Sequence, residues 1–186
     1  MGSLFLTSIF DHCKAHKEIA KAGIDLYMLR DTADAIGSQG HRTNIIETLK
    51  QFTVGDFTIL PFPVEHDVPA IGFLIQSKST NEKCVYITDS YYVRYKFTAC
   101  THMMLECNYS EELLLENINN NSTNQYLRNR IQRSHFSLNH LKEFLLANDL
   151  SKVQTIYLMH LSNSNADEVQ IRREIQELTG KLVVVC

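Results

Sequence analysis

Five histidine and aspartate residues stand where four predicted strands end, and together they could bind a metal ion. They are Asp11 and His12 after residues 4–10, His66 after 59–64, Asp89 after 84–88, and His160 after 156–159. In a layered α/β fold the carboxyl ends of the strands meet at one edge, where side chains from distant positions converge. Imidazole nitrogens and carboxylate oxygens suit zinc, manganese or iron. A metal held in this way would lower the pKa of its bound water to ~7.

A purely structural role is the alternative for each of these residues. Asp11 stands where the N-cap of the following helix would be. A single histidine at the end of a strand can also serve only as a hydrogen-bonding group. Spacing alone leaves the metal site and the structural role both open.

The elements that would position these residues alternate between strands and helices. Residues 4–10 predict a buried strand, 11–22 a helix that ends at Gly23, and 24–29 a second strand parallel to the first. The end of the chain predicts a strand over 155–159, a helix from an Asn165 cap to Leu178, a stop at Gly180 and a strand over 182–185. The pattern indicates an α/β or α+β protein.

The middle of the chain predicts shorter elements. They are two short strands within 53–64 that its prolines interrupt, a hairpin of 70–76 and 84–88, a strand within 97–107, a loop over 117–124, and a helix capped by Ser137. Basic side chains in this part could contact a substrate phosphate, although a solvated helix face is the simpler interpretation. They are His102, His135, His140, Arg128, Arg130 and Arg133.

Composition limits the class of protein. The chain of 186 residues is long enough for one domain and is 44% hydrophobic, which excludes wholesale disorder. Its 18 Lys and Arg against 21 Asp and Glu give a net charge of −3, without the basic excess of most nucleic-acid-binding proteins. No apolar run approaches the ~20 residues of a membrane span. Five cysteines without CxxC spacing read as reduced thiols, so we expect a cytoplasmic protein without a membrane anchor.

Several segments occur in an order that resembles one family. They are His66–Ile75, Val85–Ser90 and Leu158–Asn165, together with Glu106-Cys107-Asn108-Tyr109 as a Glu-x-Asn segment and residues 6–15 as a divergent His-x-His-x-Asp-His loop. This series resembles the metallo-β-lactamase-fold hydrolases. It is most similar to the branch with phage-borne anti-Pycsar cyclic-nucleotide phosphodiesterases and related nuclease-like proteins. The resemblance covers nearly the whole chain.

The resemblance implies an αββα sandwich with a pair of metal ions at one edge. His66 would bind the first ion and Asp89 would bridge the two ions, while Asp11, His12 and His160 would hold the second. It also implies catalytic roles for Asp11, which would handle the proton of the metal-bound water, and for His160, which would help polarise the phosphoryl oxygen.

Three polar residues at the start of the last helix could receive a substrate phosphate. Ser162, Asn163 and Asn165 offer small polar side chains next to backbone amides. The capping role is by itself enough to explain Asn165.

The chain departs from the family at two points. Where the family has its first two histidines, this chain has Thr7 and Ile9, or Ser8 and Phe10 if one residue is deleted. The first metal would then keep only His66 and Asp89, whereas the second would keep a full set of ligands. We therefore expect one or two zinc or manganese ions, with the first-metal site incomplete.

The second departure lies before the metal loop, where family members have several strands and this chain has ten residues. We expect one domain over 1–186 whose first sheet lacks its N-terminal strands. A second copy in a homodimer would cover the exposed sheet edge.

Two functions follow from these features. One is a metal-dependent hydrolase of a cyclic nucleotide or a nucleic acid, with the net charge favouring a small nucleotide over long duplexes. The other is a catalytically degenerate protein of the same fold that binds a ligand or a partner.

Overall fold

The computed structural model describes residues 2–4, 13–120 and 125–186, which contain ten strands and six helices. The strands are β1 (Gly2–Leu4), β2 (Asp25–Met28), β3 (Thr43–Ile45), β4 (Phe52–Val54), β5 (Phe57–Val64), β6 (Ala70–Ser77), β7 (Lys83–Ile87), β8 (His102–Glu106), β9 (Thr155–Met159) and β10 (Leu182–Val185). The helices are α2 (His16–Lys21), α3 (Arg30–Ile36), α4 (Glu111–Asn119), α5 (Gln125–Ser134), α6 (Leu138–Ala147) and α7 (Glu168–Thr179). In this described part no helix is long and apolar enough to cross a bilayer.

The first sheet has three parallel strands in the order β1-β2-β3, with α2 and α3 packed on one face. Along β2 the side chains alternate, so Leu26 and Met28 pack with the helices while Tyr27 points to the other face. Gly23 after α2 and Gly37 after α3 have φ of 83° and 65°, a backbone that favours glycine. The strand Gly2–Leu4 pairs parallel with β2, in the predicted direction. Of the predicted strand 4–10 only Leu4 lies within the described residues, so the rest of that strand stays a prediction.

The second sheet has seven strands in the order β10-β9-β8-β7-β6-β5-β4. The strands β7 to β10 are mutually parallel, and β4, β5, β6 and β7 pair antiparallel, so the predicted hairpin of β6 and β7 is confirmed. Pro61 and Pro63 are tolerated inside β5 because β4 pairs only with Phe57–Ile59, which leaves the prolines on an edge where no ladder N–H is needed.

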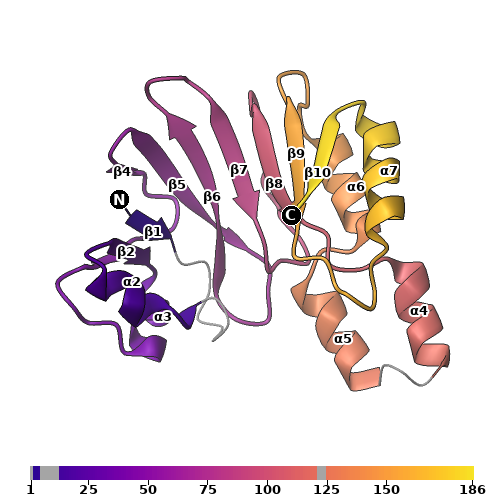
Figure 1. Cartoon of the computed structure of the whole chain (residues 1–186), viewed down its shortest axis with the longest axis horizontal. Coiled ribbons are helices and arrows are strands. Elements are labelled where there is room, and N and C mark those ends of the chain that lie inside the picture. The colour runs from indigo at the N-terminus through magenta and orange to yellow at the C-terminus, as the bar shows by residue number, and fades with distance from the viewer. Residues whose placement is uncertain (1, 5–12, 121–124) are drawn as a thin grey trace.

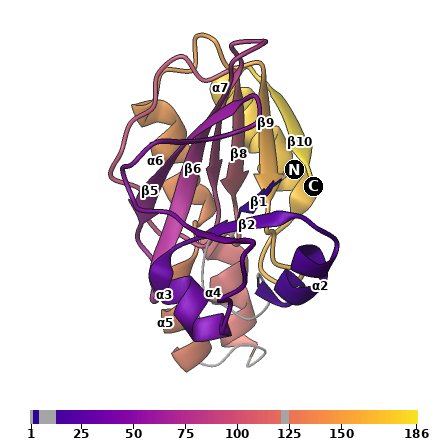
Figure 2. The same cartoon turned by 90° about the vertical axis from the view of Figure 1, so that its left-hand side faces the viewer.

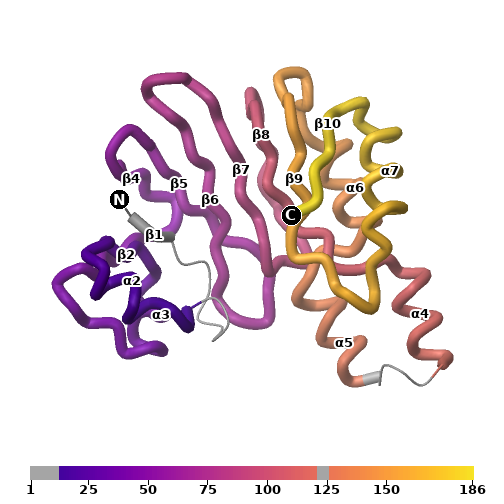
Figure 3. Tube along the Cα trace, viewed as in Figure 1, coloured from indigo at the N-terminus to yellow at the C-terminus, as the bar shows by residue number. Residues whose placement is uncertain are grey.

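The two sheets pack face to face, with α2 and α3 on one outer side and α6 and α7 on the other, while α4 and α5 project beyond the strand ends (Figures 1 and 3). Tyr27 of β2 and Ile46, which follows β3, pack in one cluster with Ile71 and Phe73 of β6. Residues of α6 and α7, among them Leu141, Phe144, Ile171 and Ile175, pack against the opposite face of the seven-stranded sheet. Figure 2 shows the end of the molecule that carries the three-stranded sheet, with α2 and α3 towards the viewer. The predicted αββα sandwich with a short first sheet is therefore confirmed.

Several elements differ from the prediction. The loop predicted over 117–124 overlaps the end of α4, which begins after a Ser110 cap whose side chain accepts from the Leu113 amide. The cap of α7 is Asp167, which accepts from the Gln170 amide at 2.9 Å, and not Asn165. The side chain of Asn165 is buried and accepts a hydrogen bond from Asn117 Nδ2, so it is not available as a cap.

Candidate metal centre

The carboxyl ends of four strands lie at one edge of the seven-stranded sheet. The parallel neighbours β7, β8 and β9 end there, and β5 runs in the same direction because two antiparallel pairings separate it from β7. Asp89 follows β7, Glu106 ends β8, His160 follows β9, and His66 follows β5. His135 reaches the same edge from the connection between α5 and α6.

A buried glutamate organises the centre. Oε1 of Glu106 accepts hydrogen bonds from Nδ1 of His135 at 2.5 Å and from Nδ1 of His160 at 2.8 Å. Its second oxygen, Oε2, accepts from the backbone amide of Ser90 at 3.1 Å. Glu106 is 0% exposed, so the desolvation of its carboxylate is offset by three donors that fix both imidazole rings in place.

Two of the residues sit on strained backbone. Asp89 and His160 have φ of 51° and 57°, the left-handed region that non-glycine residues rarely adopt. Each stands directly beyond a strand, where a sharp turn aims its side chain back over the edge of the sheet. Asp89 Oδ1 lies 3.9 Å from Nδ1 of both His135 and His160. Leu49, Asn81 and Ala99, which lie outside the centre, share this conformation, so it does not by itself mark the site.

His66 lies beside these residues on the β5 side. Its side chain is 1% exposed, its Nδ1 lies 2.9 Å from Asp67 Oδ1, and its ring centroid lies 5.9 Å from that of His135. Burial lowers the pKa of His66 more than the nearby carboxylates of Asp67 and Asp89 raise it. The ring is therefore held neutral near pH 7, which is the form that binds a metal.

His160 is shifted in the other direction. The hydrogen bond to Glu106 raises the pKa of His160 above its usual value, and burial opposes this only in part. Without a metal, this imidazole keeps a proton to a higher pH than an exposed histidine would.

The donor set fits a divalent transition metal. Asp89, Glu106, His135 and His160 each offer one ligand atom, and these four atoms lie within 4.8 Å of one another. Two imidazoles and two carboxylates are the donors that zinc and manganese accept. The Nδ1 atoms of His135 and His160 both converge on Oε1 of Glu106, so this carboxylate either orients the two rings or joins them as a ligand.

The structure brings together three of the five predicted metal ligands, His66, Asp89 and His160. The other two, Asp11 and His12, lie outside the described residues, as do both alternative positions for the missing histidines. Of the predicted phosphate-binding residues, Ser162 and Asn163 line a hollow of about 410 Å³ together with His160. Asn165 follows these residues in the chain, but its side chain is buried and does not line the hollow.

The sequence prediction missed Glu106 and His135 as members of the metal centre. Glu106 stood in a recognised motif and at a strand end like the others, so its position alone could have suggested it. His135 follows a helix that was not predicted, and nothing local distinguishes it from His102 or His140.

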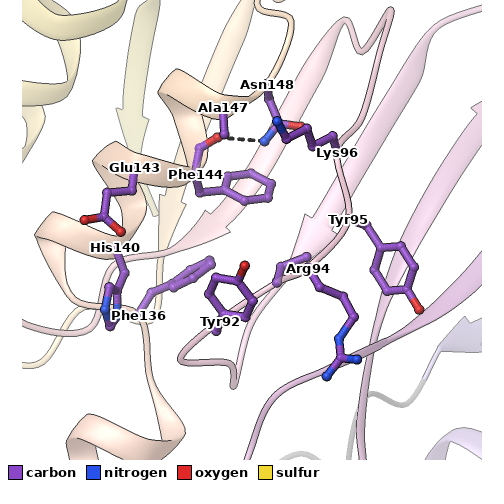
Figure 4. Close-up of a pocket in the computed structure, with 11 residues that line it drawn as sticks. Tyr92, Arg94, Tyr95, Lys96, Phe136, His140, Glu143, Phe144, Ala147 and Asn148 are labelled. Carbon is purple, nitrogen blue, oxygen red and sulfur yellow. Dashed lines mark hydrogen bonds between the residues drawn. The ribbon is translucent and has the colours of Figure 1, made fainter.

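A second hollow lies between residues 92–96 and α6 (Figure 4). Its volume is about 220 Å³, and Phe136, Phe144 and Tyr92 form its apolar part. Figure 4 shows Arg94 and Tyr95 directed away from this apolar part, and Arg94 forms an ion pair with Glu65. None of the four residues of the candidate metal set lines this hollow, so it is separate from the centre.

No family model and no curated protein matches the chain. Solved structures do match it over its whole length. The metallo-beta-lactamase fold protein YhfI from Bacillus subtilis has a TM-score of 0.72 and 14% identity, with 100% of this chain aligned to 74% of that chain. Igni18, a metallo hydrolase from the archaeon Ignicoccus hospitalis, has a TM-score of 0.70 and 11% identity, with 100% aligned to 75%. Unliganded yeast PDE1 has a TM-score of 0.70 and 10% identity, with 100% aligned to 66%.

These identities are low, so the likeness concerns the fold. The chain has the metallo-β-lactamase fold, and its candidate metal centre lies at the carboxyl edge of the larger sheet.

Proposed function

We propose that this metallo-β-lactamase-fold chain is a metal-dependent hydrolase of phosphodiester bonds. The observation that carries the proposal is the buried carboxylate of Glu106, which holds two imidazoles beside Asp89 on strained backbone at the strand ends. Burying a carboxylate that needs this many charge-assisted contacts costs more free energy than a structural role alone would require. The resemblance to the anti-Pycsar branch and the likeness to yeast PDE1 favour a phosphodiester as substrate.

The chain's own residues would divide the work between holding the metal and handling protons. A divalent ion, zinc or manganese, would supply Lewis acidity towards a phosphoryl oxygen and acidify a water. His66, Asp89 and His160 would hold it, together with Asp11 and His12, and Asp11 and His160 remain the proposed catalytic residues. Glu106 would orient the rings of His135 and His160 through their Nδ1 atoms.

His135 offers a route for the leaving group's proton. Its Nδ1 is bound to Glu106, and its side chain is 20% exposed, so its Nε2 is the nitrogen left to face a substrate. An imidazole held by a carboxylate is a common general acid in hydrolysis. In this role His135 would stand outside the ligand set and donate a proton to the departing oxygen, while Glu106 would hold the ring through its Nδ1.

The substrate would be a nucleotide diester, a cyclic nucleotide or a nucleic-acid strand. The hollow at Ser162 and Asn163 adjoins His160, and hydroxyl and amide groups there suit phosphate and sugar oxygens. Asn165 would act only by holding the segment in place, through its bonds with Asn117 and Ser162.

The test combines metal content with hydrolysis. Protein purified without added metal or chelator is analysed for zinc and manganese per chain, and then assayed on cyclic AMP and on a short RNA. We expect at least one ion per chain and activity that His160→Ala and Asp89→Asn abolish while the circular dichroism is unchanged. The exposed Glu177→Gln on α7 is the control and should keep full activity. A metal-free, inactive protein that still binds nucleotides would instead support the degenerate binding protein.

We also propose a single domain that pairs with a second copy and works in a reducing compartment such as the cytoplasm. The three-stranded sheet has β1 at one edge, and a strand from a partner could extend it. All five cysteines are free thiols. Light scattering after size-exclusion chromatography should give about twice the chain mass of 21.4 kDa, and a monomeric mass would contradict the dimer.

A further inference from the structure

Helix α5 carries a basic stripe that leads to the candidate metal centre. Its sequence contains three arginines and no acidic residue, although the whole chain has a net charge of −3. Tyr126, Arg130 and Arg133 are spaced i, i+4 and i+7 and therefore share one face of the helix. All three are exposed, Tyr126 at 80%, so this face is turned to solvent.

The stripe is oriented towards the centre. In Figure 1, α5 projects beyond the strand ends beside α4, with its carboxyl end nearest the sheet. The His135 amide donates a helical hydrogen bond to the Ile131 carbonyl, so the last turn of the helix reaches the centre. With a rise of about 1.5 Å per residue, Tyr126 and His135 are separated by about 13 Å along the helix. Arg130 Nε also lies 3.5 Å from Asp67 Oδ2, next to His66.

We infer that this face of α5 binds single-stranded nucleic acid and guides it to the metal centre, so that the substrate of the proposed hydrolase is a strand rather than a mononucleotide. The inference rests on the proposed function. A mononucleotide has one diester, which the metal centre would occupy. Arg133 would then have no phosphate to contact, and Arg130 would keep only its ion pair with Asp67. A strand places further phosphates along α5, and the exposed ring of Tyr126 offers a surface on which a base can stack.

The third arginine of α5, Arg128, does not belong to the stripe. Arg128 lies on the opposite side of the helix and is half-buried, close enough to Tyr109 for its charge to act on the pKa of that phenol. On α5 itself the basic surface is therefore one helix face wide. A single strand matches this width better than a duplex, which is usually bound by a broad basic surface.

The experiment measures strand binding separately from hydrolysis. The protein as purified is titrated into a fluorescein-labelled phosphorothioate oligothymidylate, which resists hydrolysis, and anisotropy is followed at several salt concentrations. For Arg130→Gln/Arg133→Gln we expect roughly tenfold weaker binding and a salt slope shallower by about 1.4. For Tyr126→Ala we expect roughly fivefold weaker binding or more, with the slope unchanged. The control is Arg172→Gln/Arg173→Gln, which removes the same charge from the exposed face of α7 and should bind as the parent does.

The outcomes separate this inference from the proposed function. Unchanged affinity and slope in the α5 variants, or equal losses in the α7 control, would overturn the inference even if cyclic AMP is hydrolysed. Equal competition by poly-glutamate or by duplex DNA would also overturn it, because the surface would then be a general anion binder. Strand binding that depends on α5 in a protein without hydrolytic activity would support α5 as the strand-binding surface and refute both the proposed function and the strand's role as its substrate.

Discussion

Two carboxylates in this protein each accept three hydrogen bonds, and only one of them has the surroundings of a functional centre. Asp56 Oδ2 accepts from Ser77 Oγ, Ser79 Oγ and the Ser79 amide, and so links the turn between β4 and β5 to the turn between β6 and β7. Glu106 accepts from two imidazoles and one amide at the opposite end of the strands.

Neither hydrogen bonding nor backbone strain distinguishes the two regions. The turn near Asp56 contains Asn81 with φ of 59°, much as the metal centre contains Asp89 and His160. The difference lies in burial and in the type of donor. Asp56 is exposed and its donors are hydroxyls and an amide, whereas Glu106 is fully buried and its donors are metal-competent rings. Dense hydrogen bonding to a carboxylate therefore indicates order, and the imidazole partners indicate chemistry.

The largest effect should come from Glu106→Gln. The amide cannot orient both rings as the carboxylate does, so metal affinity should fall by about 10- to 100-fold. A chelator competition titration measures this. Asp56→Asn is the matched change in the other region and should leave metal affinity unchanged. Equal losses in both variants would remove the distinction drawn between the two carboxylates.

The next effect concerns strained backbone in both regions. A valine in the left-handed region costs about 1–2 kcal/mol, whereas asparagine tolerates it. We therefore expect Asp89→Val and Asn81→Val to lower the free energy of unfolding by similar amounts, measured by urea denaturation.

The companion change Asp89→Asn isolates the charge at the metal centre. It should leave the free energy of unfolding within about 1 kcal/mol of the parent and still weaken metal binding at least tenfold. If Asp89→Asn binds metal as well as the parent does, Asp89 is not a ligand.

A smaller effect is the pH dependence of the unfolding free energy, which differs in sign between the two regions. The pKa of His160 is raised in the folded chain, so its contact with Glu106 stabilises the metal-free protein fully below the unfolded pKa of 6.5. That contribution is lost as the pH rises through the folded pKa, which is above 6.5. The difference in unfolding free energy between the parent and His160→Gln, measured in a chelator, should therefore shrink from pH 6 to pH 8. A difference that grows over this range would contradict the assignment.

The smallest effect, with the opposite sign, is expected at Asp56. Hydrogen bonds from Ser79 and Ser77 lower the pKa of Asp56 below 3.8. Its contribution to stability is present above the unfolded pKa and is lost as the pH falls through the lower folded value. Asp56→Asn should therefore lower Tm slightly at pH 7 and by less as the pH falls below 3.8, as thermal melts followed by circular dichroism can show. The pair Ser77→Ala/Ser79→Ala should reproduce the result.

Local patterns predicted much of the fold. The glycines after α2 and α7 and the Ser137 cap of α6 mark helix ends through short-range backbone chemistry, and the structure confirms them. The pattern failed for α4 and for the cap of α7. For the cap of α7 a tertiary contact decided the outcome, since Asn165 accepts from Asn117 and Asp167 caps the helix instead. The start of α4 is a local Ser110 cap that the sequence analysis did not use.

The residue types and their places at strand ends are properties of the sequence itself, because strand boundaries depend on local apolar runs. From these, His66, Asp89 and His160 could be predicted to lie at one edge, whereas Asp11 and His12 stay predictions. Only the tertiary structure could add His135, since it reaches the edge through the path of α5 and not through any strand. Only the tertiary structure could also make Glu106 the shared acceptor of two rings, because that requires β8 to lie between β7 and β9. Strand order depends on long-range pairing, and long-range pairing leaves no local trace in the order of the residues.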